Sequence, residues 1–180
     1  MKESGLAVQP ARNTSVQKDA PADLIERVNS LYDRIARRAY EIFDGNGRVT
    51  GRGLADWLQA EQEFLRPLHL EISESPAALT VRAEVPGYKT NDLEINVAPR
   101  RVTIMGTRET KKESKTKEII YSETCSDQIL RVFDLPAAVD RVRVKATLKD
   151  GVLDLEMPKA TPADAAKADS KAVKVEPQAA

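Results

Sequence analysis

Hydrophobic and polar positions follow two different periods along this chain, and the change falls near Leu70. Before Leu70, apolar residues recur at steps of three and four, which is typical of one face of an amphipathic helix. The first such stripe comprises Leu24, Ile25, Val28, Leu31, Tyr32, Ile35, Ala36, Ala39, Ile42 and Phe43. A second, shorter helix is predicted to carry Leu54, Trp57, Leu58, Phe64 and Leu65 before Pro67. We expect the two helices to close into a hairpin over their apolar faces.

After Leu70, apolar residues alternate with polar ones, which is the period of a half-buried strand. The alternating segments are 79–85, 93–97, 102–104, 119–121, 129–133, 142–148 and 153–157. Asp150-Gly151 predicts a tight hairpin turn, because glycine tolerates the positive φ that such turns require. The stretch Glu109–Glu118 is rich in lysine and glutamate and predicts an exposed loop. Many short strands separated by turn residues indicate an antiparallel β-sandwich.

Four regions follow from these patterns. Residues 1–21 are polar and aperiodic, which predicts a disordered arm, and residues 22–67 form the helical region. Residues 68–160 form the sandwich, and residues 161–180 read as a flexible tail. The tail has one apolar element, Val173-Lys174-Val175, whose spacing puts two branched side chains on one face of an extended strand. Such a segment can dock into a groove at a sheet edge.

Composition narrows the classes of function. The 28 basic and 28 acidic residues cancel, so no global field attracts nucleic acid or an anionic membrane. No apolar run approaches the length of a membrane span, and nothing marks the N-terminus for secretion, so we expect a cytoplasmic protein. Cys125 is the single cysteine, which excludes an internal disulfide and a cysteine zinc site.

The segment after the first helix begins like a calcium-binding EF-hand loop, at Asp44-Gly45-Asn46. The match fails where ligands are needed: Arg48 replaces an oxygen ligand, Val49 stands in place of the turn glycine, and Ala55 stands in place of the bidentate glutamate. A turn that ends the helix is the better interpretation, since paired glycines permit left-handed backbone.

Two further alternatives are weak. A DNA-binding helix-turn-helix would need a shorter connection, and the arginines of the first helix are offset by acidic neighbours. His69 is the single histidine, and no serine, cysteine or metal-ligand pattern surrounds it. No triad, phosphate loop or metal spacing is visible, so we expect neither an enzyme nor a cofactor.

Three sequence motifs in the strand region together resemble the α-crystallin domain of small heat-shock proteins. The hairpin motif A-x-x-x-(N/D)-G-V-L is matched by Ala146, Asp150, Gly151, Val152 and Leu153. Val85-Pro86-Gly87 ends one strand, and the motif R-x-F-x-L-P is matched by Arg131, Phe133, Leu135 and Pro136. The family's usual glycine before that last strand is replaced by Asp127-Gln128, which leaves the local turn open. Residues 34–67 are similar to a small helical module of unknown function seen in several bacterial proteins.

The resemblance, which covers about residues 70–159, implies a mainly β fold: an immunoglobulin-like antiparallel sandwich preceded by two amphipathic helices and followed by the tail. It implies that Val173 and Val175 join dimers into larger homo-oligomers. The groove for the tail would be lined by strand residues, namely Leu93, Ile95, Val144, Ala146 and Leu148. A loop strand exchanged between the subunits of a dimer would contain Glu118, Ile119, Ile120 and Tyr121. Glu123 would be an ionic partner across that dimer, and Arg131 would have an ionic or structural role there.

The function that the resemblance implies is that of an ATP-independent holdase chaperone of the stress response, which binds unfolding proteins and prevents their aggregation. Its partners would be itself and those clients. The apolar residues expected to contact clients are Leu31, Tyr32, Ile35, Phe43, Trp57 and Phe64. The alternatives that stay open are a β-sandwich module that recruits one specific partner and, with less support, an enzyme with a dispersed site.

Overall fold

The structure, a computed structural model, describes residues 21–116, 119–161 and 172–179, and for residues 110–125 it describes the backbone without the side chains. The chain divides into two compact units, of which the first ends at Leu65 and the second begins at Arg66. The first unit is helical, and the second contains all the described strands.

The helical unit consists of α1 (Ala22–Gly45) and α2 (Gly53–Phe64). Pro21 precedes the first helical residue. Proline is tolerated at this position because the first N–H groups of a helix have no hydrogen-bond acceptor within the helix. The two helices pack against each other, with the rings of Tyr32 and Trp57 stacked at 6.2 Å between centroids. The Arg38 guanidinium holds Glu63 in a two-pronged ion pair, in which Nη2 donates to Oε1 at 3.1 Å. The predicted helical hairpin is therefore confirmed.

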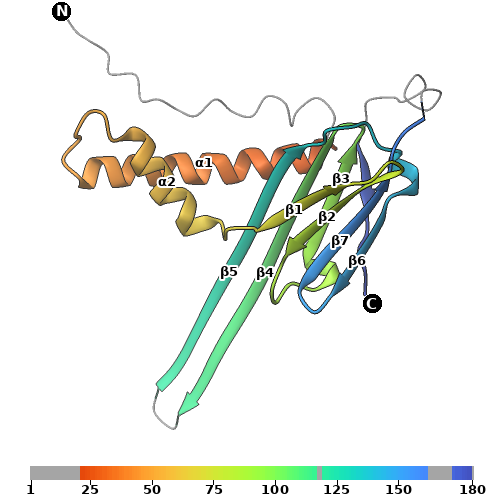
Figure 1. The fold of residues 1–180 in the computed structure, drawn as a ribbon. Coiled ribbons are helices and arrows are strands. Elements are labelled where there is room, and N and C mark those ends of the chain that lie inside the picture. Colours follow the sequence, from red (N-terminus) through yellow and green to blue (C-terminus); the bar gives the residue numbers. More distant parts are fainter. Residues whose placement is uncertain (1–20, 117–118, 162–171, 180) are drawn as a thin grey trace, which may run out of the picture. The chain divides into compact units, whose positions relative to one another are not determined.

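The second unit is a sandwich of two sheets (Figure 1). The five-stranded sheet contains, in spatial order, β1 (Leu70–Glu74), β2 (Ala78–Glu84), β7 (Val152–Pro158), β6 (Lys145–Lys149) and β9 (Gln178–Ala179). The four-stranded sheet contains β5 (Ile119–Asp134), β4 (Arg101–Thr116), β3 (Leu93–Ala98) and β8 (Val173–Val175). All these strand pairs are antiparallel except that of β6 with β9. The predicted sandwich is confirmed.

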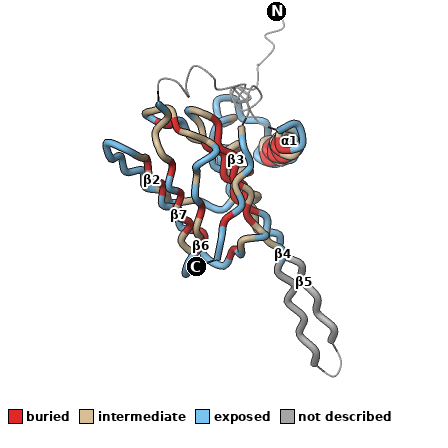
Figure 2. The backbone as a smooth tube through the Cα atoms, turned by 90° about the vertical axis from the view of Figure 1, so that its right-hand side faces the viewer, coloured by how far each residue is buried: buried red, intermediate tan, exposed pale blue. Residues whose placement is uncertain are grey.

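The core of the sandwich lies between the sheets, and alternate residues of β2, β6 and β7 are buried in it (Figure 2). On β2 these are Leu79, Val81 and Ala83, and on β7 they are Leu153, Leu155 and Met157. The register aligns the two sets, with Leu79 opposite Met157 and Val81 opposite Leu155. This is the alternation from which the strands are predicted.

The two loop motifs of the family pattern meet at one end of the sandwich. Asp150 and Gly151 both have positive φ, of 51° and 76°, as a two-residue hairpin turn between β6 and β7 requires. The Val85 amide donates to the Gly151 carbonyl at 2.7 Å. A Cβ on Gly151 would lie 3.2 Å from the Pro86 Cα, so this glycine also permits a close approach.

The interpretation of Glu109–Glu118 as a loop is wrong for the part that the structure describes. β4 runs through it to Thr116, and β4 and β5 pair in continuous register from Arg101–Asp134 to Thr116–Ile119. Beyond the Leu93–Gly106 pair, β4 has no partner but β5 among the described residues, and the hairpin extends past the other strands (Figure 1). A two-stranded ribbon outside the sandwich has no core face, so its sequence need not alternate. The same register places Asp127 and Gln128 within β5, with no turn there.

The predicted strand 142–148 begins too early. Arg141–Arg143 form one 3₁₀ turn, capped by the Asp140 side chain, which accepts from the Val142 amide at 3.0 Å. Val142 is 84% exposed, and β6 begins at Lys145. The local side-chain cap at Asp140 competes with strand pairing and overrides the alternation at Val142.

Candidate assembly groove

The candidate site is the side of the sandwich where β3 and β6 would be the edge strands of the two sheets if the tail were absent. β8 pairs with β3, and β9 pairs with β6. An unpaired edge presents a row of N–H and C=O groups that can accept another strand. The tail of the chain occupies both edges.

β8 is the predicted tail motif. It pairs with β3 in antiparallel register, with Val175 opposite Ile95 and Val173 opposite Val97. The two valines differ in burial, because Val175 packs against the sandwich core whereas Val173 is 36% exposed. The assignment of these residues to assembly between subunits stays a prediction.

The residues predicted to line the groove lie on or beside the two edge strands. Leu93 and Ile95 are on β3, and Ala146 and Leu148 are on β6, and all four are buried in the core cluster. Val144 lies just before β6 and is partly buried against the same cluster. The structure thus brings these five residues into one core, which the tail contacts through Val175.

Three tail residues that matter here escaped the sequence analysis. Gln178 and Ala179 form β9, which pairs in parallel with Thr147 and Leu148 of β6. Pro177, between β8 and β9, is buried. Pro177, two residues after Val175, was the one available signal, since proline fixes φ of the extended backbone.

The predicted exchanged strand lies in the hairpin. Glu118 lies outside the described residues, and the backbone of Ile119, Ile120, Tyr121 and Glu123 belongs to β5. These residues pair with Thr116, Lys115, Ser114 and Lys112 of β4 in the same chain. The other edge of β5 has no strand partner among the described residues. Their role in a dimer stays a prediction.

Arg131 is exposed on β5, opposite Ile104 of β4. It lies on the same face as Ile129 and Phe133, which contact the core. A charged side chain on an edge strand disfavours indiscriminate pairing of that edge. Its role between subunits stays a prediction.

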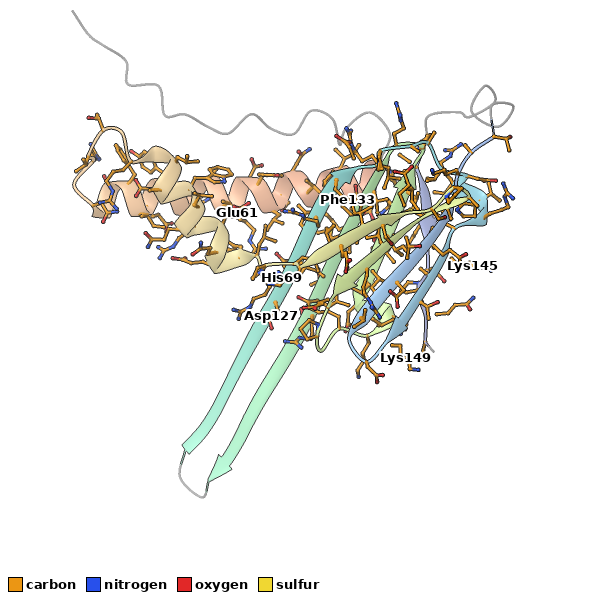
Figure 3. All side chains as sticks on the ribbon, in the orientation of Figure 1. Glu61, His69, Asp127, Phe133, Lys145 and Lys149 are labelled. Atoms are coloured by element: carbon orange, nitrogen blue, oxygen red, sulfur yellow. The ribbon has the colours of Figure 1, made fainter. Side chains whose placement is uncertain are left out.

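An ion-pair cluster holds the root of the hairpin, and its centre is Asp127 on β5 (Figure 3). The Asp127 carboxylate accepts from Nη2 of Arg108 at 2.6 Å and from Nε of Arg66 at 2.9 Å. The Arg108 guanidinium lies 5.3 Å from the centroid of the Tyr88 ring. A side chain on Gly87 would collide with that guanidinium.

The same hydrogen bonds set the charge state of Asp127. The hydrogen bonds from Arg108, which has the larger effect, and from Arg66 lower the pKa of the Asp127 carboxyl, because both bonds favour its charged form. The pKa of Arg108 is raised by its hydrogen bond to Asp127. The cluster thus joins four segments at the point where the hairpin leaves the sandwich. They are the segment before β1 (Arg66), the turn that follows β2 (Tyr88), strand β4 (Arg108) and strand β5 (Asp127).

The residues predicted to contact clients differ in exposure. Leu31 and Ile35 are buried, and Tyr32, Phe43, Trp57 and Phe64 are partly buried. The exposed large apolar side chains of the helical unit are instead Tyr40, Val49, Leu54 and Leu58. Leu54 and Leu58 are one helical turn apart on α2, at 59% and 45% exposure, so they share one face.

The segment that resembles a calcium loop is a helix-ending turn. The Asp44 carboxylate accepts from Nε of Arg48 at 2.6 Å, and Gly47 has a φ of 78°. Across the described ranges, no three histidine, cysteine or acidic side chains gather as metal ligands would. His69 is exposed, and the Cys125 side chain is outside the described part.

Comparisons with known proteins agree with this architecture. The model of the Hsp20/alpha crystallin family matches residues 71–176. A second model, of a protein of unknown function (DUF2934), matches residues 30–66, which is most of the helical unit. Within the described residues, no helix is long and apolar enough to cross a membrane.

Among the relatives, an 18.1 kDa class I heat shock protein of Oryza sativa is 33% identical over 161 residues, which cover 84% of this chain and 98% of that protein. Spore protein SP21 of Stigmatella aurantiaca is 35% identical over 89 residues, or 49% of this chain and about half (53%) of that protein. A small heat-shock protein structure from Xylella fastidiosa covers 54% of this chain and 92% of its own, at 28% identity and a TM-score of 0.42. The family model matches more than half of this chain, which therefore belongs to the Hsp20/alpha crystallin family of small heat-shock proteins.

Proposed function

We propose that this chain is an ATP-independent holdase: it binds proteins that are unfolding and keeps them from aggregating. Membership of the small heat-shock protein family, over residues 71–176, carries the proposal. The chemistry needs no catalytic residue, because burial of exposed apolar surface of a client lowers the free energy by about 25 cal/mol per Å². The holdase acts in the cytoplasm without a cofactor.

The working form is a dimer that assembles into larger homo-oligomers. The groove at β3 and β6 and the tail that fills it are complementary surfaces of one chain. If the tail of one subunit enters the groove of another, every pairing is kept, as in other exchanges of an identical element. Val173 and Val175 are then the joint between subunits. The hairpin strand around Ile119–Tyr121 is the contact within the dimer.

Clients bind to apolar surface of the helical unit. Leu54 and Leu58 are exposed there already, whereas Leu31 and Ile35 become accessible only if the hairpin of α1 and α2 opens. Contacts of this kind tolerate many client sequences, and an assembly with many copies binds one client at several points.

The test is suppression of heat-induced aggregation of a heat-labile model enzyme, followed by light scattering, with the intact chain at stoichiometric ratios. We expect scattering to fall with added chain and to be the same with and without ATP. An equal mass of a non-chaperone protein is the control. Scattering that is no lower than in this control would overturn the proposal.

The second candidate is a module that recruits one specific partner. The exposed pair Leu54 and Leu58 on α2 favours it, because a compact apolar face of this kind also suits a single docking protein. A chain that binds one folded protein tightly and leaves denatured clients unprotected would support this candidate against the holdase.

A further inference from the structure

The tail of this chain contacts the edges of both sheets. β8 extends the four-stranded sheet beside β3, and β9 extends the five-stranded sheet beside β6. Only Glu176 and Pro177 separate the two tail strands in the sequence. The tail therefore crosses from one sheet to the other within two residues and pairs at both ends of the crossing.

The apolar burial of the tail is concentrated in the middle of this crossing. Val175 packs against the core, and Pro177 is buried, whereas Val173 at the start of β8 is 36% exposed. The residues of β9 are themselves exposed, so β9 is held by backbone pairing with Thr147 and Leu148. The V-x-V segment is thus only part of the contact.

Pro177 suits this position for two reasons. It has no N–H, so at the step between two sheets it leaves no donor without an acceptor. Its ring fixes φ and pushes the preceding residue, Glu176, towards extended backbone. The undocked tail therefore has fewer conformations to lose at the crossing when it docks.

We propose that the docking unit of the tail is the seven-residue segment Val173–Ala179, a two-sheet anchor in which Pro177 and β9 form a second contact that decides how firmly and in which register the tail is held. The occupant of the groove is this segment of this chain. The family model ends at residue 176, so Pro177, Gln178 and Ala179 lie beyond the matched range. The inference deepens the proposed function, because the importance of the anchor for assembly rests on the tail being the joint.

The two contacts reinforce each other. Once β8 is paired with β3, β9 follows β8 after only two residues and is held close to β6, so its pairing becomes an intramolecular event at high effective concentration. Loss of either contact is expected to loosen the other. This mutual dependence distinguishes a two-sheet anchor from a V-x-V motif whose following residues contribute nothing to docking.

The test is amide hydrogen exchange measured by mass spectrometry on the intact chain and on a variant that lacks residues 177–180. In the variant we expect exchange in β6, residues 145–149, to rise about tenfold, as for the loss of one or two backbone hydrogen bonds. A smaller rise is expected in β3, residues 93–98. Lys174→Ala is the matched control, because that side chain is exposed and the change leaves the backbone pairing of β8 intact.

A second variant, Pro177→Ala, keeps the chain length and is expected to raise exchange in β6 less than the deletion does. Val175→Gly is expected to raise exchange in both β3 and β6. Unchanged exchange in β6 after the deletion would overturn the anchor.

The same variants are also measured in the aggregation assay, so that failure of the two-sheet anchor can be distinguished from failure of the holdase function. Client protection combined with unchanged β6 exchange would remove the anchor and leave the holdase. Altered β6 exchange in a chain that protects no client would do the opposite.

Discussion

Asp127 shows how one residue can hold several segments of a fold. It accepts from Arg66, which precedes β1, and from Arg108 on β4. It stands where the family pattern has glycine, so its role was open from the sequence and became clear only when the two arginines were placed. Their positions, 61 and 19 residues away along the chain, follow from tertiary register and from no local pattern.

Changing Asp127 to asparagine is expected to lower the free energy of unfolding by about 1–2 kcal/mol at neutral pH, since two charge-assisted hydrogen bonds at a partly exposed site are weakened. A shift of the urea midpoint measures it. The control is Asp134→Asn, because Asp134 also pairs with a β4 arginine but is 72% exposed and is expected to contribute little. Equal effects of the two changes would contradict the role given to Asp127.

The same pair of proteins tests the pH dependence. Because the folded state lowers the pKa of Asp127, its contribution to stability is present above the pKa of the unfolded chain and is lost as the pH falls through the folded value. The difference in stability between the intact chain and Asp127→Asn is therefore expected to be constant near neutral pH and to shrink below about pH 4. A difference that grows on acidification would show that another group is responsible.

At the scale of elements, the period of apolar positions predicted the two helices and those strands of the sandwich that have one buried face. It did not predict β1, because all five residues of that strand are exposed or only partly buried. It failed for the outer half of the β4–β5 hairpin, where no face is buried by the sheets, and at Val142, where the Asp140 cap interrupts the strand. It also could not reveal β9, since a two-residue strand of Gln178 and Ala179 carries no period. Such elements are specified by the surface on which they pair.

The two valines of β8 form a matched pair of test positions. Val175→Gly and Val173→Gly remove the same side chain from the same strand, but Val175 packs against the core and Val173 is partly exposed. We expect Val175→Gly to weaken tail docking by about 1–2 kcal/mol and Val173→Gly by less than about 1 kcal/mol. Light scattering of the solution mass is expected to show the larger loss of assembly for Val175→Gly, and dimers when both are changed. A mass that is the same in all variants would remove the tail as the joint.

At the scale of the whole molecule, the family and the sandwich were predictable because the hairpin and strand-end motifs encode turns that few other sequences support. The exposure of the apolar side chains of the helical unit was not predictable. A helical stripe shows which residues are apolar, but only the packed structure shows that Leu31 and Ile35 are buried while Leu54 and Leu58 stay exposed.

Replacing Leu54 and Leu58 together by serine is expected to reduce protection of clients severalfold and to leave the thermal unfolding of the helices nearly unchanged, because both side chains are exposed. The contrasting variant is Leu31→Ala, which is expected to destabilise the helical hairpin by about 2–5 kcal/mol. Aggregation assays and circular dichroism melts measure the two effects. Full client protection by the serine variant would show that clients bind elsewhere.

Each chain carries one tail and one groove, and the two surfaces are different. A joint between unlike surfaces is heterologous: successive subunits either close into a ring or cage or continue as an open filament. In any closed arrangement the number of tails equals the number of grooves, so every sheet edge at β3 and β6 is covered regardless of how many subunits take part. In the proposed assembly the tail therefore sets no subunit count, and assemblies of several sizes with similar stability are the expected consequence.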